Sequence, residues 1–308
     1  MESGGCLRTM SVAVLMGGPG SEREVSLRSG AAVLRALHEL GAKAVGVEVH
    51  GCEVNLPSGV ELAYNMVHGT FGEDGRLQQL LEDMGVLYTG DGPEASRVAF
   101  DKILTKERFD AAGVPTARWE VAASWEAPRR PFPYVMKSPR QGSSVGVHIV
   151  RSEEEQDAAL SDCSTYDDRI LLEDYFPGRE LTVGILGGRA LPVVEIIPGE
   201  GFYDYANKYT PGASRYEVPA PLDAIEERAV RDAALAAWSA LGLEIYCRVD
   251  ILLGADGAIN VLEANTIPGM TETSLLPKAA AAAGIRFPEL CERIAWLSLQ
   301  RGRGGQEL

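Results

Sequence analysis

Short apolar runs alternate with amphipathic stretches over the first fifty residues. SVAVLM (residues 11–16) is continuously apolar, which is typical of a strand buried on both faces. The amphipathic stretch after it predicts a helix, with Ser21-x-x-Glu24 as a capping box before it and Gly41 as its C-terminal glycine. KAVGVEVH (43–50) predicts the next strand. A strand, a helix and a strand in this order predict a parallel sheet flanked by helices.

Beyond this unit the pattern predicts a more mixed region. NMVHG (65–69) is expected to add a strand to the first sheet, and a helix is expected near 75–84, so the first domain ends near Glu94. The elements expected next are a helix over 96–112, strands over 134–138, 145–150 and 169–175, and a helix opened by Ser152. Strands and helices mixed in so short a segment predict an α+β lobe.

The last third of the chain predicts a further β-rich domain. Its expected elements are strands over 180–186 and 190–198, a helix over 226–241 and a hairpin after it. Residues 199–216 are rich in Gly, Tyr and Pro, and the aromatic side chains favour a functional lid over a disordered loop. The predicted domains are therefore 1–94, 95–178 and 179–308, with residues 1–9 as a flexible extension before the first strand.

A turn signal divides two strands of the last domain. Gly254-Ala-Asp-Gly257 lies between CRVDILL and AINVLEAN, and Asp-Gly favours a two-residue type I′ loop. With that loop, Asp250 lies opposite Glu263. Two residues further from the turn, Arg248 lies opposite Asn265. Side chains alternate along a strand, so these four project from one face, and a four-residue loop would shift the pairing by two residues without changing the face.

Oxygen ligands gather on this face of the predicted hairpin. Asp, Glu and Asn supply the hard oxygens that magnesium favours together with substrate phosphates, and a neighbouring Arg248 suits phosphate on metal. The alternative is an acid pair on a solvated strand edge. After Asn265, Pro268-Gly269 stops the strand, and a helix beginning near Thr273 would present backbone N–H groups and Ser274 to a carboxylate. An ordinary strand-to-helix connection is the alternative there.

Composition is that of a soluble globular enzyme with two or three domains. The chain has 308 residues, of which 45% are hydrophobic and 24% charged. Its net charge of −15 argues against broad nucleic-acid binding, although a few basic side chains in one cleft can still hold a small anion. The chain shows no membrane-spanning run and no secretory signal. Its five cysteines are scattered without a CxxC pair, which favours reduced cytosolic thiols.

Several motifs of the sequence resemble those of a known family. RVD…LEANTIPGMTETSL resembles the C-terminal signature of D-alanine–D-alanine ligases in the ATP-grasp superfamily. Further matches follow in order over nearly the whole chain, namely GGPGSEREVSLRSG (17–30), HGTFGEDG (68–75), YTG (88–90), DK (101–102), KSPRQGSSVG (137–146), LLEDYFPGRELTV (171–183) and FYDYANKY (202–209). The resemblance implies a three-domain ATP-grasp architecture, α/β and α+β, with a parallel-sheet N-terminal domain.

The resemblance also implies an ATP site. Lys102, Lys137 and the lid residue Lys208 would hold phosphates, and Ser144 lies in a glycine-rich loop that can close over them. The adenine wall would comprise Glu173, Asp174, Tyr175 and Phe176, with Glu180 on the ribose. Two Mg²⁺ ions, for which Mn²⁺ can substitute, would be held by Asp250, Glu263 and Asn265. Any one of these residues, taken alone, would be an ordinary surface charge or turn.

The substrate roles rest on the resemblance too. Glu22 would hold the amino group of the first D-alanine, although by itself it could be the first-turn acid of a helix. Ser143 and Tyr209 would form a hydrogen-bonded group with Glu22. His68 would lie near the first carboxylate; a satisfied buried histidine is the alternative. The remaining implied contacts are Arg248 and the Gly269 N–H at the oxyanion, and Ser274 and Leu275 at the second substrate's carboxylate.

The implied reaction has two steps. The carboxylate of the first D-alanine attacks the γ-phosphate of ATP, and the amine of the second D-alanine then displaces phosphate from the acyl phosphate. The dipeptide would serve peptidoglycan precursor synthesis and cell shape. The family further implies a cytoplasmic homodimer that takes D-alanine and ATP and binds neither nucleic acid nor membrane.

Rival functions are disfavoured by particular residues. A dinucleotide-binding oxidoreductase fails because Arg23 stands where G-x-G-x-x-G needs its third glycine, and no Walker motif is present. A D-alanine–D-lactate ligase is disfavoured by Tyr209, and a catalytically dead relative by retention of the metal ligands and cleft lysines. One departure from the family is Ser138, where proline usually follows the lysine. Serine frees a backbone N–H, so a modest effect on loop stiffness is expected.

Overall fold

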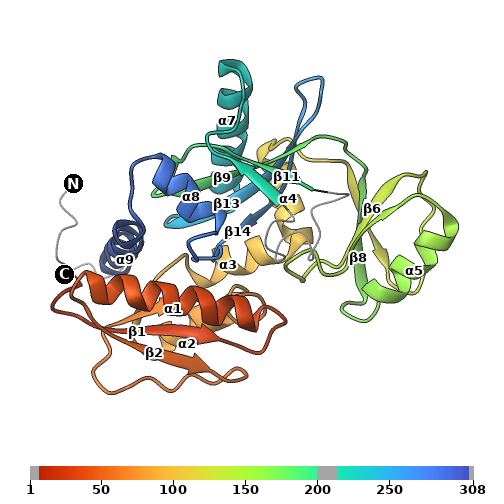
Figure 1. Ribbon diagram of the computed structural model, residues 1–308. Coiled ribbons are helices and arrows are strands. Elements are labelled where there is room, and N and C mark those ends of the chain that lie inside the picture. The colour runs from red at the N-terminus through yellow and green to blue at the C-terminus, as the bar shows by residue number, and fades with distance from the viewer. Residues whose placement is uncertain (1–6, 200–213, 305–308) are drawn as a thin grey trace.

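The computed structural model describes residues 7–199 and 214–304. Within that part of the chain three β-sheets form, each with helices against it (Figure 1). The N-terminal sheet has the order β2-β1-β3-β4, and its pairings are parallel. Its elements are β1 (Ser11–Gly17), α1 (Arg23–Glu39), β2 (Lys43–Val49), β3 (Leu62–Asn65), α2 (Arg76–Asp83) and β4 (Leu87–Tyr88). The parallel sheet expected from the order of strand, helix and strand is confirmed.

Two local predictions in this domain are wrong. The third strand ends at Asn65 rather than covering 65–69, because the Asn65 side chain accepts a backbone N–H two residues further on and turns the chain out of the sheet. Helix α1 has Glu22 at its N-cap and no side-chain capping bond, so the box expected from Ser21 and Glu24 does not form. The Glu22 carboxylate is instead held by a residue of the central sheet's loop.

The central lobe is an antiparallel sheet with one helix, as expected for an α+β lobe. The strand order is β5-β8-β6-β7. Its elements are β5 (Trp119–Ala123), β6 (Tyr134–Lys137), β7 (Val147–Val150), α5 (Glu153–Cys163) and β8 (Arg169–Asp174). Ser152 caps α5 by accepting the N–H of Glu155 at 3.2 Å, so the predicted helix start is confirmed.

The single helix expected over 96–112 is wrong. The structure has two helices there, α3 (Pro93–Phe100) and α4 (Lys102–Ala112). Asp101 between them has extended backbone angles, and its carboxylate accepts the N–H groups of the first turn of α4. The chain therefore changes direction at Asp101, and Lys102 becomes the first residue of a new helix.

The C-terminal sheet carries the hairpin. Its strand order is β12-β11-β9-β13-β14, with β10 paired to β9, and its pairings are antiparallel. The elements are β9 (Arg179–Leu186), β10 (Arg189–Ala190), β11 (Val194–Pro198), β12 (Ser214–Glu217), α7 (Ala224–Ala240), β13 (Tyr246–Leu253), β14 (Ile259–Asn265), α8 (Leu275–Ala282) and α9 (Phe287–Gly304). The lid expected over 199–216 and the extension expected over 1–9 lie largely outside the described residues. The three predicted domain boundaries stay a prediction.

The hairpin has the predicted pairs but not the predicted turn. Asp250 pairs with Glu263, and Arg248 pairs with Asn265. The loop, however, is the three-residue type in which Gly257 has φ +80° and follows a type I turn, not a two-residue type I′ loop. Regular pairing outward from this three-residue loop would place Glu263 opposite Val249, a residue of the hydrophobic core.

A β-bulge next to the pair restores the register. The pairing shifts by one residue between Ile251 and Asp250, leaving Leu262 as the extra residue in β14. This shift moves Glu263 from the core face to the face that carries Asp250.

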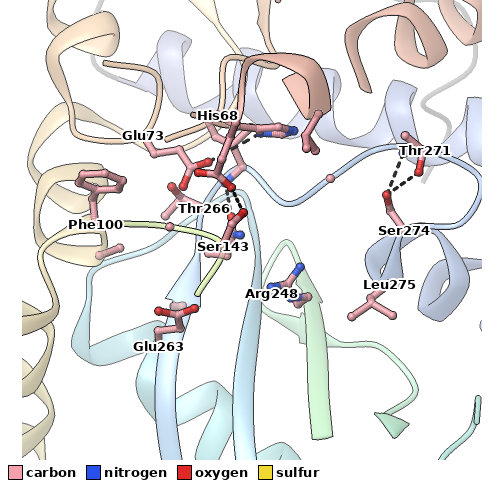
Figure 2. A pocket seen from close by; sticks show the side chains of 18 of the residues that line it. His68, Glu73, Phe100, Ser143, Arg248, Glu263, Thr266, Thr271, Ser274 and Leu275 are labelled. Carbon is pink, nitrogen blue, oxygen red and sulfur yellow. Dashed lines mark hydrogen bonds and ion pairs between the residues drawn. The ribbon is translucent and has the colours of Figure 1, made fainter. Parts of the chain in front are cut away.

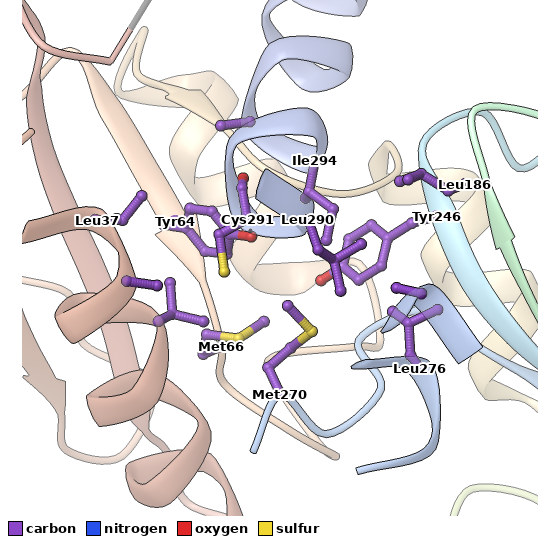
Figure 3. Packing of buried hydrophobic residues seen from close by; sticks show 14 of the residues in the cluster. Leu37, Tyr64, Met66, Leu186, Tyr246, Met270, Leu276, Leu290, Cys291 and Ile294 are labelled. Atoms are coloured by element: carbon purple, nitrogen blue, oxygen red, sulfur yellow. Dashed lines mark hydrogen bonds between the residues drawn. The ribbon is translucent and has the colours of Figure 1, made fainter. Parts of the chain in front are cut away.

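Two hydrophobic cores fix the domains around this sheet. One core joins α1 and the N-terminal sheet to α8 and α9, with Leu37, Tyr64, Met270 and Leu290 meeting in it (Figure 3). The other joins α3 and α4 to α7 and β13. Burying a large apolar side chain stabilises the fold by about 1.5–3 kcal/mol, so each core holds its elements firmly. The helix that begins at Lys102 is thereby fixed against the sheet that carries the hairpin.

Candidate active site

A cavity of about 430 Å³ lies where residues of the three sheets and their loops meet (Figure 2). A smaller cavity of about 90 Å³ lies between the central sheet and the β13–β14 hairpin. Lys102, Gln141 and Glu263 line both, so the two form one continuous cleft.

The structure brings nearly all the predicted site residues to this cleft. The larger cavity is lined by Glu22, His68, Lys102, Ser143, Arg248, Glu263, Asn265, Gly269, Ser274 and Leu275. The smaller one is lined by Lys102, Lys137, Ser144, Glu173, Asp174, Tyr175, Phe176, Glu180, Asp250 and Glu263. Lys208 and Tyr209 lie outside the described residues.

Asp250 is held rigidly at the floor of the cleft. Its two carboxylate oxygens accept hydrogen bonds from Nε and Nη2 of Arg248, each at 2.8 Å. Thr182 on β9 donates a further hydrogen bond at 2.6 Å. Arg248 and Asp250 are two residues apart on β13, so their side chains project from the same face. The bidentate pairing fixes both side chains on the cleft face.

Glu263 and Lys102 connect the hairpin to the start of α4. The Lys102 ammonium lies 3.0 Å from Oε2 of Glu263 and donates a hydrogen bond to the carbonyl of Gln141 at 2.8 Å. The backbone N–H of Lys102 also donates to Pro139. Lys102 thus ties the loop after β6 to the hairpin, and its charge lies at the boundary of the two cavities.

The donor set fits a hard divalent cation. Asp250, Glu263 and Asn265 offer carboxylate and amide oxygens on one face, the ligands that Mg²⁺ prefers alongside substrate phosphates. Residues 7–199 and 214–304 contain no group of three or more His, Cys, Asp or Glu side chains able to hold a metal by themselves.

Glu173 lies between two lysines. Its oxygens are 2.6 Å from Nζ of Lys137 and 2.8 Å from Nζ of Lys106, and its side chain is 2% exposed. Burial alone would raise the pKa of Glu173, but the two ammonium groups hold it down at about 2. The carboxylate is therefore ionised, and the adenine role expected of Glu173 stays a prediction. Lys106 was not predicted from the sequence, although its spacing of one helical turn after Lys102 was an available signal.

The loop after β6 reaches the N-terminal domain. The Ser143 hydroxyl donates a hydrogen bond to Oε1 of Glu22. Ser143 and Ser144 have φ values of +54° and +61°, a region that non-glycine residues seldom adopt. A Cβ on Gly142 would lie 2.4 Å from Oε2 of Glu22, so glycine is required for this approach.

His68 is buried beside a second acid. Its Nε2 is hydrogen-bonded to Ser29 at 3.2 Å, and its Nδ1 lies 3.7 Å from Oε1 of Glu73. Burial, with a further contribution from the Arg248 charge, lowers the pKa of His68 to about 4, so the imidazole is neutral near pH 7. Burial also raises the pKa of Glu73, and the Glu22 charge adds to this. Glu73 was missed from the sequence, although it stands within the HGTFGEDG motif.

The segment after β14 ends at the start of α8. Ser274 occupies the N-cap of α8, but its hydroxyl accepts the N–H of Thr271 at 3.0 Å and does not cap the helix. Figure 2 shows this pair close to Leu275, and all three residues line the larger cavity. The first-turn N–H groups of α8 have no side-chain cap, which suits an anion.

Comparisons with known proteins identify the family. A family model described as D-Ala D-Ala ligase C-terminus matches residues 109–295. The chain is 48% identical over 292 residues to a D-alanine–D-alanine ligase of Methylacidiphilum infernorum, covering 94% of this chain and 96% of that protein. The chain belongs to the D-alanine–D-alanine ligase family. The resemblance stated from the motifs is confirmed.

Other members of the family match over similar lengths. The D-alanine–D-alanine ligase of Citrifermentans bemidjiense is 47% identical over 296 residues, covering 94% of this chain and 96% of that one. A solved D-alanine–D-alanine ligase of Bacillus anthracis superposes with a TM-score of 0.86 at 33% identity, covering 97% of this chain and 100% of that one. A structure of the Bacillus anthracis enzyme with ATP gives 0.84 at 32% identity, covering 96% and 99%. The predicted ATP-grasp fold is confirmed.

Among the helices of residues 7–199 and 214–304, none combines the length and apolar character needed to cross a bilayer.

Proposed function

We propose that this chain joins two D-alanine molecules to D-alanyl-D-alanine, using ATP and passing through D-alanyl phosphate. One observation carries the proposal: a single cleft holds the Glu22–Ser143 pair, the Arg248–Asp250 pair and the Glu263–Lys102 pair. Relatives named D-alanine–D-alanine ligases, matched over 94% of the chain, support it.

ATP would occupy the smaller cavity and extend toward the hairpin. Tyr175 and Phe176 would flank adenine, and Glu180 would hold the ribose. Lys137 and Lys102, with Lys208 from the lid, would neutralise phosphate charge. Asp250, Glu263 and Asn265 would hold two Mg²⁺ ions, or Mn²⁺ in their place. Bound metal would offset the negative charge that grows on the phosphates.

The first D-alanine would lie in the larger cavity. Glu22, held by Ser143, would bind its ammonium group, and Tyr209 would complete that group of hydrogen bonds. Neutral His68 would lie beside its carboxylate without placing a competing positive charge there. The carboxylate oxygen is then directed toward the γ-phosphate between Lys102 and Arg248.

The second D-alanine would be held at the other end of this cavity. Its carboxylate would meet Ser274 and the N–H groups that open α8 near Leu275. Its amine would attack the acyl phosphate carbonyl. The oxyanion that forms would be stabilised by Arg248 and the N–H of Gly269. Phosphate leaves as the peptide bond forms.

A competition assay tests the proposal. Purified protein with ATP and Mg²⁺ receives D-alanine and D-lactate together, and products are separated by mass. Dipeptide as the main product near neutral pH, with one ADP per bond, is expected. No phosphate release above the substrate-free control would refute the ligase function, and ester as the main product would move the chain to the D-lactate branch. The family also implies a cytoplasmic homodimer, which light scattering after gel filtration would test.

A further inference from the structure

Lys106 is more deeply buried than Lys102 and Lys137, the lysines that line the cleft. Its side chain is 1% exposed, and it lines neither cavity. Its ammonium lies 2.8 Å from Oε1 of Glu173 and donates a hydrogen bond to the hydroxyl of Thr116. A lysine so placed contacts no substrate directly, so any functional effect must pass through Glu173 or Thr116.

The charges in this cluster do not balance. One carboxylate, Glu173, serves two ammonium groups, those of Lys106 and Lys137. Removing a charge from water is costly, and a single ammonium group already matches the charge of the carboxylate. Burial lowers the pKa of Lys106, against the opposing effect of Glu173 and a smaller attraction to Asp110. Within ion-pair distance the cluster has two ammonium groups and one carboxylate, and Lys137 and Glu173 line the smaller cavity whereas Lys106 does not.

A chain of hydrogen bonds links the cluster to the hairpin. The Thr116 hydroxyl, which accepts from Lys106, donates to the carbonyl of Val261 at 2.8 Å. The backbone N–H of Val261 donates to Pro115, and Asn260 accepts the N–H of Ala117. Lys106 is therefore linked to β8 through Glu173. Through Thr116 it is linked to β14, the strand that carries Glu263.

We infer that Lys106 is a positioning residue for ATP, acting as an internal counter-ion that shares Glu173. Because Lys106 holds one oxygen of Glu173, the carboxylate neutralises Lys137 only in part, and the Lys137 charge remains available to phosphate. The inference rests on the proposed ATP site, but not on which acceptor the enzyme uses.

Direct ATP binding tests this without relying on turnover. The dissociation constant for ATP with Mg²⁺ is measured by calorimetry on the intact chain without D-alanine. Lys106→Met should weaken ATP binding about tenfold, because Glu173 then pairs with Lys137 alone. Lys43→Met removes the same charge from an exposed position on β2 and should leave the constant unchanged. Under saturating ATP, kcat of Lys106→Met should change far less than KM for ATP.

A double variant separates the counter-ion role from a structural one. Glu173 lines the ATP cavity, so the double variant Lys106→Met/Glu173→Gln is compared with Glu173→Gln alone. If Lys106 acts only through the Glu173 charge, the two should bind ATP equally. A lower affinity in the double variant than in Glu173→Gln, or an unchanged affinity in Lys106→Met, overturns the inference. If Lys106→Met does not fold, Lys106→Gln keeps the polar contacts without the charge and should show the same pattern. Lys106-dependent ATP binding without dipeptide formation would refute the ligase proposal while leaving this inference standing.

Discussion

The hydroxyl of Ser143 donates a hydrogen bond to the carboxylate of Glu22, although the two residues lie 121 positions apart in the chain. Glu22 stands at the N-cap of α1 in the N-terminal domain, and Ser143 lies in the loop between β6 and β7. Both residues line the larger cavity. Ser143 has a left-handed backbone here, and a Cβ on the neighbouring Gly142 would meet the Glu22 carboxylate.

Ser143→Ala should weaken use of the first D-alanine. Removing one partner of a buried hydrogen bond costs about 1–3 kcal/mol, so kcat/KM for D-alanine should fall roughly fivefold to a hundredfold. KM for ATP should change much less. Ser161→Ala, on the exposed face of α5 in the same lobe, is the matched control. Unaltered D-alanine kinetics in Ser143→Ala would show that the contact is not used in the reaction.

Glu263→Gln should abolish turnover while leaving the fold intact. The amide keeps the shape of the side chain but removes the charge that a metal requires, a loss of several kcal/mol or at least about a hundredfold in rate. The rate should be followed against Mg²⁺ concentration, with thermal unfolding alongside. Asp232→Asn, an exposed acid on α7, should behave as the unaltered chain. Near-normal activity in Glu263→Gln would contradict the metal assignment.

We expect the ionisation of Asp91 to lower the free energy of unfolding as pH rises. It accepts the N–H groups of Glu244 and Ile245, and burial raises its pKa to about 6. A carboxyl with a raised folded-state pKa holds its proton better in the native state. Its contribution to the free energy of unfolding is therefore complete below the ordinary pKa of 3.8. That contribution is lost as pH rises through the folded-state pKa of about 6.

Asp91→Asn isolates this effect. The amide retains an oxygen acceptor but cannot ionise, so the variant should gain about 1–2 kcal/mol relative to the unaltered chain between pH 5 and pH 8. Urea denaturation at the two pH values measures the difference. An equal difference at both would mean that Asp91 does not titrate in this range.

Gly72→Ala should destabilise the N-terminal domain strongly. An added Cβ would lie 1.9 Å from the carbonyl oxygen of Val67, a backbone atom that cannot move alone. The Gly72 carbonyl also accepts hydrogen bonds from Asn65 and Gln78, which a shifted loop would break. A loss of about 3 kcal/mol or more is expected, read as a drop in melting temperature. Gly85→Ala meets open space and should cost only about 1–2 kcal/mol for its positive φ.

The hairpin shows how correct strand pairs can follow from an incorrect turn. Counting from a two-residue loop gave the right partners for Asp250 and Arg248, but the loop has three residues. The bulge at Leu262 cancels the difference. A bulge has no reliable signal in one sequence, because it is set by how both strands pack against the core and the neighbouring strand β9.

The fold class was predictable from the sequence, and so were most of the residues that line the cleft. Periodicity and turn residues are local, so they predicted the parallel sheet, the α+β lobe and the cap at Ser152. The motifs supplied the lysines, the acids and the family.

Only the tertiary structure decided which charges pair. The Glu22 side chain accepts a hydrogen bond from Ser143 and does not cap α1. Glu173 forms ion pairs with both Lys106 and Lys137, and Glu263 forms one with Lys102. Each of these contacts joins residues from different elements that only the folded chain brings together. Burial then makes every unpaired charge costly, so the pairing depends on which groups the packed domains place within reach, and sequence spacing carries no record of that.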